Sequence, residues 1–224
     1  MWIQLTLLFR LKAIVKFVEK KDKLVDVGCD HAFLDIYLVK KNKNIKAIAS
    51  DIAEGPVEAA KQNIKREKLE NKIEVRIGNG LDTYSDEVNT IIISGMGGRN
   101  MIGIFKRHLE VLKKVDTIIL SPNNYQIDVK KFLVNNGFYI ENEEFVKDKK
   151  FIYQIIVFKK GKKRYTKKEF FFGPIYLEKK GKLFEEYYKR ELMSRKILLQ
   201  VLPKNFVWKR FITKQEIKML EKEL

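Results

Sequence analysis

Two strand-like segments, residues 138–146 (FYIENEEFV) and residues 151–159 (FIYQIIVFK), decide the fold. Both are rich in β-branched and aromatic residues, and only the charged stretch 147–150 (KDKK) separates them. A stretch this short leaves no room for a crossover helix, so the two strands have to pair antiparallel. The sequence therefore predicts a β-hairpin at one edge of a sheet.

The residues before this hairpin alternate between short apolar strands and helical segments. We predict strands at residues 24–28, 45–51, 72–78, 90–95 and 117–122, and helices at residues 54–69, 99–113 and 126–136. Several strands are apolar almost throughout, which is typical of parallel strands covered on both faces. The pattern predicts a doubly wound α/β sheet with right-handed crossovers. Five parallel strands closed by a terminal antiparallel hairpin form the outline of a class I, Rossmann-like methyltransferase.

Positive charge is concentrated at the end of the chain. The 224 residues include 46 Lys and Arg against 29 Asp and Glu, a net charge of +17, and residues 159–224 alone contribute +12. A surface of this kind suits a polyanion, with nucleic acid the first expectation and an acidic membrane face the second. An ordinary solvated surface would carry more interspersed acids.

Apolar spacing in the C-terminal third predicts a helical hairpin. Six apolar residues recur at helical intervals, which places them on one face of a long helix: Leu177, Phe184, Tyr188, Leu192, Leu199 and Leu202. Residues 203–205 (PKN) end that helix, and a capping box at residues 213–216 (TKQE) predicts the start of a second one. We therefore divide the chain into a methyltransferase domain, residues 1–159, and a basic coiled-coil hairpin, residues 160–224. The aromatic runs at 170–172 and 187–188 are interpreted as packing residues rather than base-stacking platforms.

Cysteine and histidine usage limits the chemistry. The single Cys29 excludes an intramolecular disulfide, and one Cys with two His residues leaves no set of ligands for zinc, so we expect no metal. Residues 1–9 are interpreted as an amphipathic helix rather than a secretory signal, because Arg10 and Lys12 interrupt the apolar run. No later stretch is long enough to span a membrane. We expect a soluble, cytoplasmic monomer.

The loop after the first predicted strand, residues 26–32 (DVGCDHA), favours one nucleotide cofactor over others. Gly28 permits a tight turn, whereas Asp30 and Phe33 replace the second and third glycines of a dinucleotide-binding motif. Asp30 would place negative charge where a pyrophosphate must bind, so a nicotinamide or flavin cofactor is disfavoured. A cationic sulfonium with an adjacent amino acid group tolerates these carboxylates. Cys29 is interpreted as a packing residue, since no second base lies within sequence reach to activate it.

Four further strand ends carry polar or glycine-rich loops, and ligands of such sheets bind at this edge. Asp51 can accept hydrogen bonds from ribose hydroxyls, and Asn79 can pair with an adenine edge. Residues 94–99 (SGMGGR) expose backbone to a flat ligand, with Met96 able to pack on its ring. Any one of these loops could be a purely structural turn. Together they favour S-adenosylmethionine.

The combined motifs resemble the bacterial TrmK family of tRNA (adenine22-N1)-methyltransferases. The resemblance rests on D-x-G-x-D-H-A-F-L at 26–34, Asp51 with Gly55-Pro56, GNGL at 78–81, GMGG at 95–98 and L-x-P-N at 120–123. It covers residues 9–158, and the C-terminal hairpin resembles the family's coiled-coil domain in character. The chain departs from the family pattern at several positions, where Cys29, Phe33, Asp35, Asn79 and Ser121 replace Ser, Tyr, Pro, Asp and Gln.

The resemblance implies S-adenosylmethionine-dependent methylation of N1 of an adenine in the D-arm of tRNA. We predict Asp30 and His31 as the catalytic residues, because methylation makes the adenine ring cationic and a nearby carboxylate stabilises that charge. The implied cofactor-binding residues are Asp26, Gly28, Asp51, Ile52, Asn79, Gly80, Gly95 and Met96. The implied substrate-binding residues are Arg10, Gly97, Gly98, Pro122 and Asn123. From the residues alone, two alternatives stay open: a methyltransferase acting on another RNA or on a protein, and a non-catalytic RNA-binding protein with a Rossmann-like fold.

Overall fold

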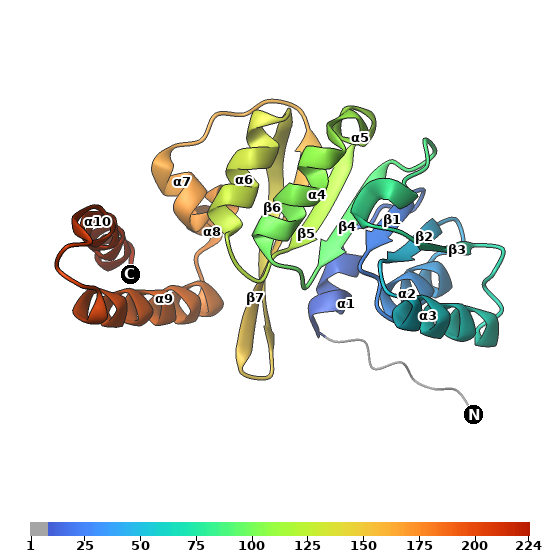
Figure 1. The fold of residues 1–224 in the computed structure, drawn as a ribbon, viewed down its shortest axis with the longest axis horizontal. Helices are drawn as coiled ribbons and strands as arrows, with labels where there is room; N and C mark the ends of the chain where they lie inside the picture. The colour runs from blue at the N-terminus through green and yellow to red at the C-terminus, as the bar shows by residue number, and fades with distance from the viewer. Residues whose placement is uncertain (1–8) are drawn as a thin grey trace. The chain divides into compact units, whose positions relative to one another are not determined.

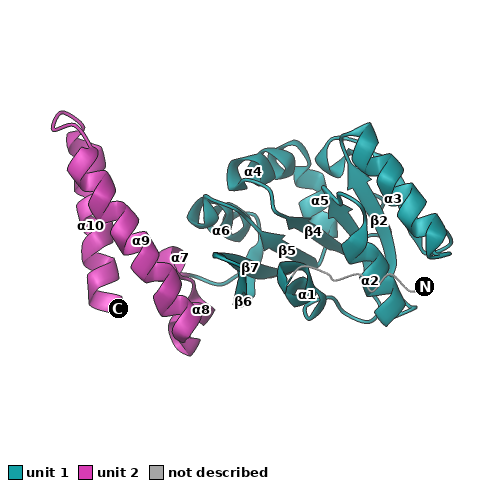
Figure 2. Cartoon of the chain, turned by 90° about the horizontal axis from the view of Figure 1, so that it is seen from below, with its two compact units in different colours: residues 1–164 teal, residues 165–224 magenta. Residues whose placement is uncertain are grey.

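The structure is a computed structural model that describes residues 9–224 and comprises two compact units, residues 1–164 and 165–224 (Figure 2). The predicted domain boundary at 159/160 falls at the end of the last strand of the first unit. Residues 1–8 of the predicted N-terminal helix lie outside the described part of the chain. The first described helix, α1 (Phe9–Val15), begins directly after them.

The first unit is built on a seven-stranded sheet in the order β3-β2-β1-β4-β5-β7-β6 (Figure 1). Its strands are β1 (Lys23–Val27), β2 (Lys46–Asp51), β3 (Ile73–Ile77), β4 (Thr90–Ser94), β5 (Thr117–Ser121), β6 (Phe138–Asp148) and β7 (Phe151–Lys160). The first five are parallel, and β7 pairs antiparallel with both β5 and β6. This confirms the five predicted parallel strands and the terminal hairpin.

Helices cover both faces of the sheet, as the buried composition of the central strands requires (Figure 1). The helices α1, α2 (Phe33–Lys41) and α3 (Glu54–Arg66) cover one face, and α4 (Gly98–Arg107), α5 (Leu109–Lys114) and α6 (Gln126–Asn135) cover the other. A short 3₁₀ helix, η1 (Gly80–Thr83), follows β3. Gly137, with φ +89°, directly follows the end of α6 and its C-cap Asn136, which confirms the predicted stop.

The single helix predicted at residues 99–113 is wrong, because α4 and α5 are separate helices. His108 breaks them apart with non-helical backbone angles of φ −130° and ψ 47°. Its Nε2 lies 3.1 Å from Oδ1 of Asp82, so the side chain turns toward η1. Apolar periodicity continues across the break and conceals it in the sequence.

The second unit contains α7 (Lys167–Phe172), α8 (Pro174–Lys179), α9 (Lys182–Val201) and α10 (Val207–Glu223). The predicted long helix is wrong at its beginning, since Lys180 and Gly181 separate α8, which holds Leu177, from α9. Its predicted end before Pro203 is confirmed. Phe172, Phe184 and Tyr188 are buried against one another, and the Tyr188 hydroxyl donates to the Phe172 carbonyl at 2.8 Å. Packing is therefore confirmed for these rings.

The capping box predicted at Thr213 is also wrong. Thr213 lies inside α10, and its hydroxyl donates to the Lys209 carbonyl one turn earlier, at 2.9 Å. The structure places a capping box instead at Thr166 and Glu169, where each side chain accepts from the other residue's backbone N–H at the start of α7. No helix within residues 9–224 is long and apolar enough to cross a membrane.

Candidate active site

The loops after the parallel strands lie side by side at the C-terminal edge of the sheet. The backbone N–H groups of Gly28 and Cys29 donate to the Ser50 carbonyl at 2.8 and 2.9 Å, which joins the ends of β1 and β2. Gly78 N–H donates to Asp51 O at 2.9 Å. The same arrangement recurs at Gly95, whose N–H donates to Ser121 O at 3.0 Å. The structure thus brings the predicted loops together along one edge.

The loop after β1 is a left-handed turn that directs polar groups outward. Gly28, Asp30 and Ala32 have φ values of +78°, +54° and +57°, and the Ala32 N–H closes the turn on the Cys29 carbonyl at 2.9 Å. The Asp30 side chain is 75% exposed, and its Oδ1 lies 3.4 Å from Nε2 of His31. Left-handed backbone is strained at residues other than glycine, so Asp30 and Ala32 store strain at the edge of the site.

Met96 links the β1 and β4 loops. A Cβ on Gly28 would lie 3.8 Å from the Met96 methyl group, so the thioether side chain reaches the first loop. Gly80 has no room for a side chain, because its Cβ would lie 2.8 Å from Ile104 of α4. The close approach of Ile104 explains the glycine at Gly80, whereas at Gly28 the left-handed φ of +78° favours glycine.

The β4 and β5 loops are held together by side-chain amides. Asn123 Nδ2 donates to the Gly95 carbonyl at 2.6 Å, and the Asn123 N–H donates to the Met96 carbonyl at 3.0 Å. The Gly98 N–H donates to Oδ1 of Asn124 at 3.0 Å. A Cβ on Gly98 would lie 2.4 Å from the Asn124 carbonyl oxygen, so no larger residue fits there. Asn124 was not predicted as a site residue.

Arg10 of α1 reaches the same loops from outside the parallel sheet. Its guanidinium lies over the Tyr153 ring of β7, 4.7 Å from the centroid, and its Nη2 would be 3.0 Å from a Cβ on Gly95. The structure thus places the predicted substrate-binding residue Arg10 beside the β4 loop. Tyr153 was missed, since only the antiparallel insertion of β7 brings it near β4.

Two buried carboxyl groups lie beneath the β1 loop. Burial, and to a lesser extent the charge of Asp51, raises the pKa of Asp26 to about 7. Burial and the neighbouring Asp26 raise the pKa of Asp35 well above its usual value. Neither carboxylate oxygen of Asp35 has a hydrogen-bond partner among the described residues. Asp35 was predicted only to depart from the family pattern, although an acid in the apolar segment FLDIYL is itself a signal of a special environment.

Cys29 lies above these carboxyl groups and is buried. Burial, with the charges of Asp35 and Asp26, raises the pKa of its thiol far above the ordinary value. A group that stays protonated is a poor nucleophile. The interpretation of Cys29 as a packing residue is consistent with this environment.

The remaining predicted residues lie along the same edge in different environments. Oδ1 of Asp51 accepts from the Ala53 N–H at 3.1 Å, and the Ile52 side chain is exposed. Asn79 Oδ1 accepts from Arg107 Nη2 at 3.0 Å, so this oxygen already has a donor within the protein. Pro122 is buried under the β5 loop.

An exposed aromatic residue completes the edge and was not predicted. Tyr125 follows the Pro-Asn-Asn turn in left-handed backbone, with φ +53°, and is exposed. The Arg99 guanidinium lies 4.1 Å from its ring centroid. Its position directly after the turn was the available signal, but its exposure depends on a backbone angle that the sequence does not reveal.

The hydrogen-bond acceptors at this edge fit the amino acid and ribose groups of S-adenosylmethionine. The Asp26 carboxylate accepts no hydrogen bond from the described residues and can therefore accept from an ammonium group, while Asp51 presents acceptors for ribose hydroxyls. Gly28 and Met96 bring backbone and a polarisable side chain to the space between them. Among residues 9–224, no cluster of three or more His, Cys, Asp or Glu side chains is placed to hold a metal ion.

The strand order and this set of acceptors define a class I S-adenosylmethionine-dependent methyltransferase. Residues 24–222 match the sequence profile of the TrmK family, tRNA (adenine(22)-N(1))-methyltransferase, and the chain belongs to this family. S-adenosylmethionine is accordingly its cofactor.

Similar proteins support the same assignment. The tRNA (adenine(22)-N(1))-methyltransferase of Bacillus subtilis is 29% identical over 159 residues, which cover 70% of this chain and 67% of that protein. A Streptococcus pneumoniae protein solved in complex with S-adenosyl-L-methionine is 31% identical, with a TM-score of 0.88 and coverage of 96% and 98% of the two chains. The structure of M. capricolum TrmK with S-adenosyl-homocysteine is 25% identical, with a TM-score of 0.84 and coverage of 96% of each chain.

Proposed function

We propose that this chain transfers a methyl group to N1 of adenine 22 in the D-arm of bacterial tRNA. Membership of the TrmK family supports the reaction and its substrate. The observation that carries the proposal is the exposed Asp30 carboxylate, which the loop after β1 presents at the edge of the site, four residues after the buried Asp26. One face of the loop thus serves the cofactor, and the other faces a substrate.

S-adenosylmethionine supplies an electrophilic methyl group on a sulfonium centre. The protein positions adenine N1 for in-line attack, which requires the base to leave its stack. Methylation makes the purine ring cationic, so Asp30 stabilises the developing charge and accepts a hydrogen bond from the exocyclic amine. His31, with its imidazole beside Asp30, orients that carboxylate.

The cofactor side of the site uses groups at the ends of β1 to β4. Asp26 accepts from the ammonium group and Asp51 from the ribose hydroxyls. Asn79 meets the adenine ring once its oxygen is released by Arg107. The remaining cofactor contacts are assigned to Gly28, Ile52, Gly80, Gly95 and Met96.

The substrate side uses the β4 and β5 loops. Gly97 and Gly98 bring backbone close to a flat base, and Asn123 holds the two loops in register. Arg10 lies beside Gly95, where it can contact a phosphate of the substrate. Pro122 stiffens the turn before Asn123, and the exposed ring of Tyr125 offers a stacking surface for the extruded adenine.

The basic C-terminal hairpin binds the body of the tRNA. Residues 159–224 carry a net charge of +12, which suits contacts to phosphates and predicts an affinity that falls steeply with salt. Because bacterial tRNA is cytoplasmic, we place the enzyme in the cytoplasm, and we expect it to act as a monomer without a metal ion.

The proposal is tested by incubating the purified protein with labelled S-adenosylmethionine and transcribed bacterial tRNA that carries adenine at position 22. Mass spectrometry of the digested product should find N1-methyladenosine. A matched transcript with guanosine at position 22 serves as the control and should stay unmethylated. Equal methylation of both transcripts, or none of either, contradicts the proposal.

A further inference from the structure

The closed end of the α9–α10 hairpin combines positive charge with exposed apolar surface. We define the hairpin tip as residues 192–215, which include the end of α9, the connecting turn and the start of α10 (Figure 2). The tip has six Lys and Arg residues and no Asp or Glu. It also exposes eight large apolar side chains: Met193, Ile197, Val201, Phe206, Val207, Trp208, Phe211 and Ile212. An exposed apolar patch whose charged residues are all basic is typical of a binding surface.

Two aromatic rings form a platform on this surface. Trp208 and Phe211 lie one helical turn apart on α10, with ring centroids 5.6 Å apart and planes inclined by 21°. Their exposed fractions are 72% and 50%. Both rings are therefore exposed, whereas Leu202, Thr213 and Leu220 of the same hairpin are buried.

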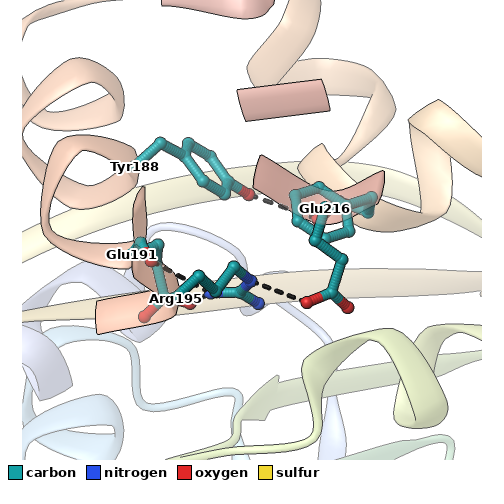
Figure 3. A network of polar contacts seen from close by, with 5 residues as sticks. Tyr188, Glu191, Arg195 and Glu216 are labelled. Carbon is teal, nitrogen blue, oxygen red and sulfur yellow. Dashed lines mark hydrogen bonds and ion pairs between the residues drawn. The ribbon is translucent and has the colours of Figure 1, made fainter. Parts of the chain in front are cut away.

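Three of the basic side chains already have structural roles. Arg210 donates to the Leu199 and Leu202 carbonyls at the end of α9. Arg195 joins Glu191 to Glu216 across the two helices (Figure 3), and Lys196 pairs with Glu221 at 2.7 Å. These contacts fix the hairpin so that the aromatic platform sits on a rigid support.

The other three basic side chains are available to a ligand. Lys204, Lys209 and Lys214 have no ion-pair partner within residues 9–224. Lys209 is adjacent to Trp208 in sequence, and Lys214 lies one turn beyond Phe211. The platform is therefore flanked by ammonium groups that can reach phosphates on either side of a stacked base.

We infer that the hairpin tip binds an unpaired nucleobase of tRNA on Trp208 and Phe211, with Lys204, Lys209 and Lys214 contacting the flanking phosphates. The inference rests on the proposed function for the identity of the RNA, and it adds a second contact outside the methyl-transfer site. Stacking of a base on an aromatic side chain contributes about 1 to 3 kcal/mol and requires no particular base. The tip therefore recognises an exposed loop or end rather than a sequence.

The positive charge of the hairpin tip favours RNA over a second copy of the chain as the ligand of this apolar patch. A second copy of the chain, packed tip to tip, would bring two acid-free basic surfaces together and repel. An anionic membrane shares the charge of RNA but offers no flat rings to match the platform. Both occupants are distinguishable outcomes of the experiment below.

Tryptophan fluorescence provides a direct test. The chain has two Trp residues, Trp2 and Trp208, so Trp2→Phe leaves Trp208 as the single reporter. Titration with transcribed tRNA should quench its emission, with a midpoint equal to the Kd from filter binding. Trp208→Ala should weaken tRNA binding by about 5- to 100-fold and raise KM while kcat stays unchanged. Trp208→Tyr should restore most of the affinity.

Two further variants provide controls. Phe151→Ala removes a ring of similar exposure, 54%, from the β6–β7 turn and should leave tRNA affinity unchanged. Replacing Lys204, Lys209 and Lys214 by Gln should reduce the steepness of the plot of log K against log salt concentration by about 2 to 3. Thermal unfolding verifies that each variant is folded.

Three results would overturn the inference: tRNA affinity that Trp208→Ala leaves unchanged, quenching by anionic vesicles equal to that by tRNA, or self-association in sedimentation that Trp208→Ala abolishes. The proposed function is tested separately by the position of the methyl group. Quenching without methylation at position 22 contradicts the function but retains the tip contact. Methylation without quenching contradicts only the tip contact.

Discussion

The side-chain amide of Asn123 donates a hydrogen bond of 2.6 Å to the carbonyl oxygen of Gly95, and so ties the end of β5 to the glycine-rich loop after β4. Asn123→Ala removes this contact and leaves the carbonyl to solvent. We expect kcat for tRNA methylation to fall by about 10-fold through looser positioning of the base, while S-adenosylmethionine affinity changes little. Steady-state kinetics and calorimetry measure the two effects. Asn136→Ala is the control, because it removes a comparable side-chain hydrogen bond at the end of α6, away from the site.

Asp30→Asn tests the assigned catalytic carboxylate. The substitution keeps the shape of an exposed side chain in a left-handed turn but removes the charge that stabilises the methylated ring. Single-turnover rates should fall by about 100-fold with unchanged cofactor affinity. Asp116→Asn, exposed before β5 at the opposite edge of the sheet, should behave as wild type. A normal single-turnover rate in Asp30→Asn would contradict the assignment of Asp30 as the catalytic carboxylate.

Gly98→Ala should damage the site through sterics alone. The added methyl group would lie 2.4 Å from the Asn124 carbonyl oxygen, so the β4 and β5 loops must separate. We expect a loss of about 1 to 3 kcal/mol in the free energy of unfolding, measured by denaturant titration, together with reduced activity. Gly55→Ala at the start of α3 meets no atom within 4 Å and should be neutral or stabilising.

The buried Asp35 should make folding stability depend on pH. Because its folded pKa is raised, the native state binds more protons than the unfolded chain above about pH 4, and stability falls as pH rises through that range. Asp35→Asn should be more stable than wild type at about pH 8, and the difference should disappear near about pH 4. Denaturant titrations at several pH values test this. A pH-independent difference would show that the carboxyl group does not titrate in this range.

Cofactor affinity should follow the charge of Asp26. With its pKa raised to about 7, this carboxyl group is largely neutral in the free protein at lower pH. S-adenosylmethionine binding should therefore weaken as pH falls below about 7, by up to about 10-fold for each pH unit. Asp26→Asn should bind weakly at every pH and flatten the profile. Calorimetry of the free enzyme across this range provides the measurement.

The sheet was predictable because its signals are local. The β-branched runs give the strands, and the four residues between 146 and 151 force the hairpin. The loop residues at the strand ends followed from topology, since parallel strands place their carboxyl ends at one edge. The position of β7 between β5 and β6 could not be predicted from local signals. The contact between Tyr153 and Arg10 depends on this position, so it could not be predicted either.

Local motifs failed where packing decides between two equivalent uses of one residue. Thr213 followed by Glu216 satisfies the capping pattern, but a threonine hydroxyl inside a helix can donate to the carbonyl one turn earlier instead. Burial of Thr213 selects the second use. Tyr125 and Asp30 likewise depend on left-handed backbone that only the surrounding turn specifies.

The insertion of β7 into the sheet affects the order in which the protein is completed during synthesis. Thr117 of β5 pairs with Lys159 of β7, so the outer edge of β5 has no partner until the ribosome has made the residues up to about 160. The strand that is made before β7, β6, pairs only with β7 and cannot cover that edge. A nascent chain that stalls inside the hairpin therefore displays an open strand bearing the substrate loop, which exposes it to aggregation and proteolysis. Insertion of β7 pairs this edge and also brings Tyr153 under the Arg10 guanidinium, so the sheet and this part of the site are completed together.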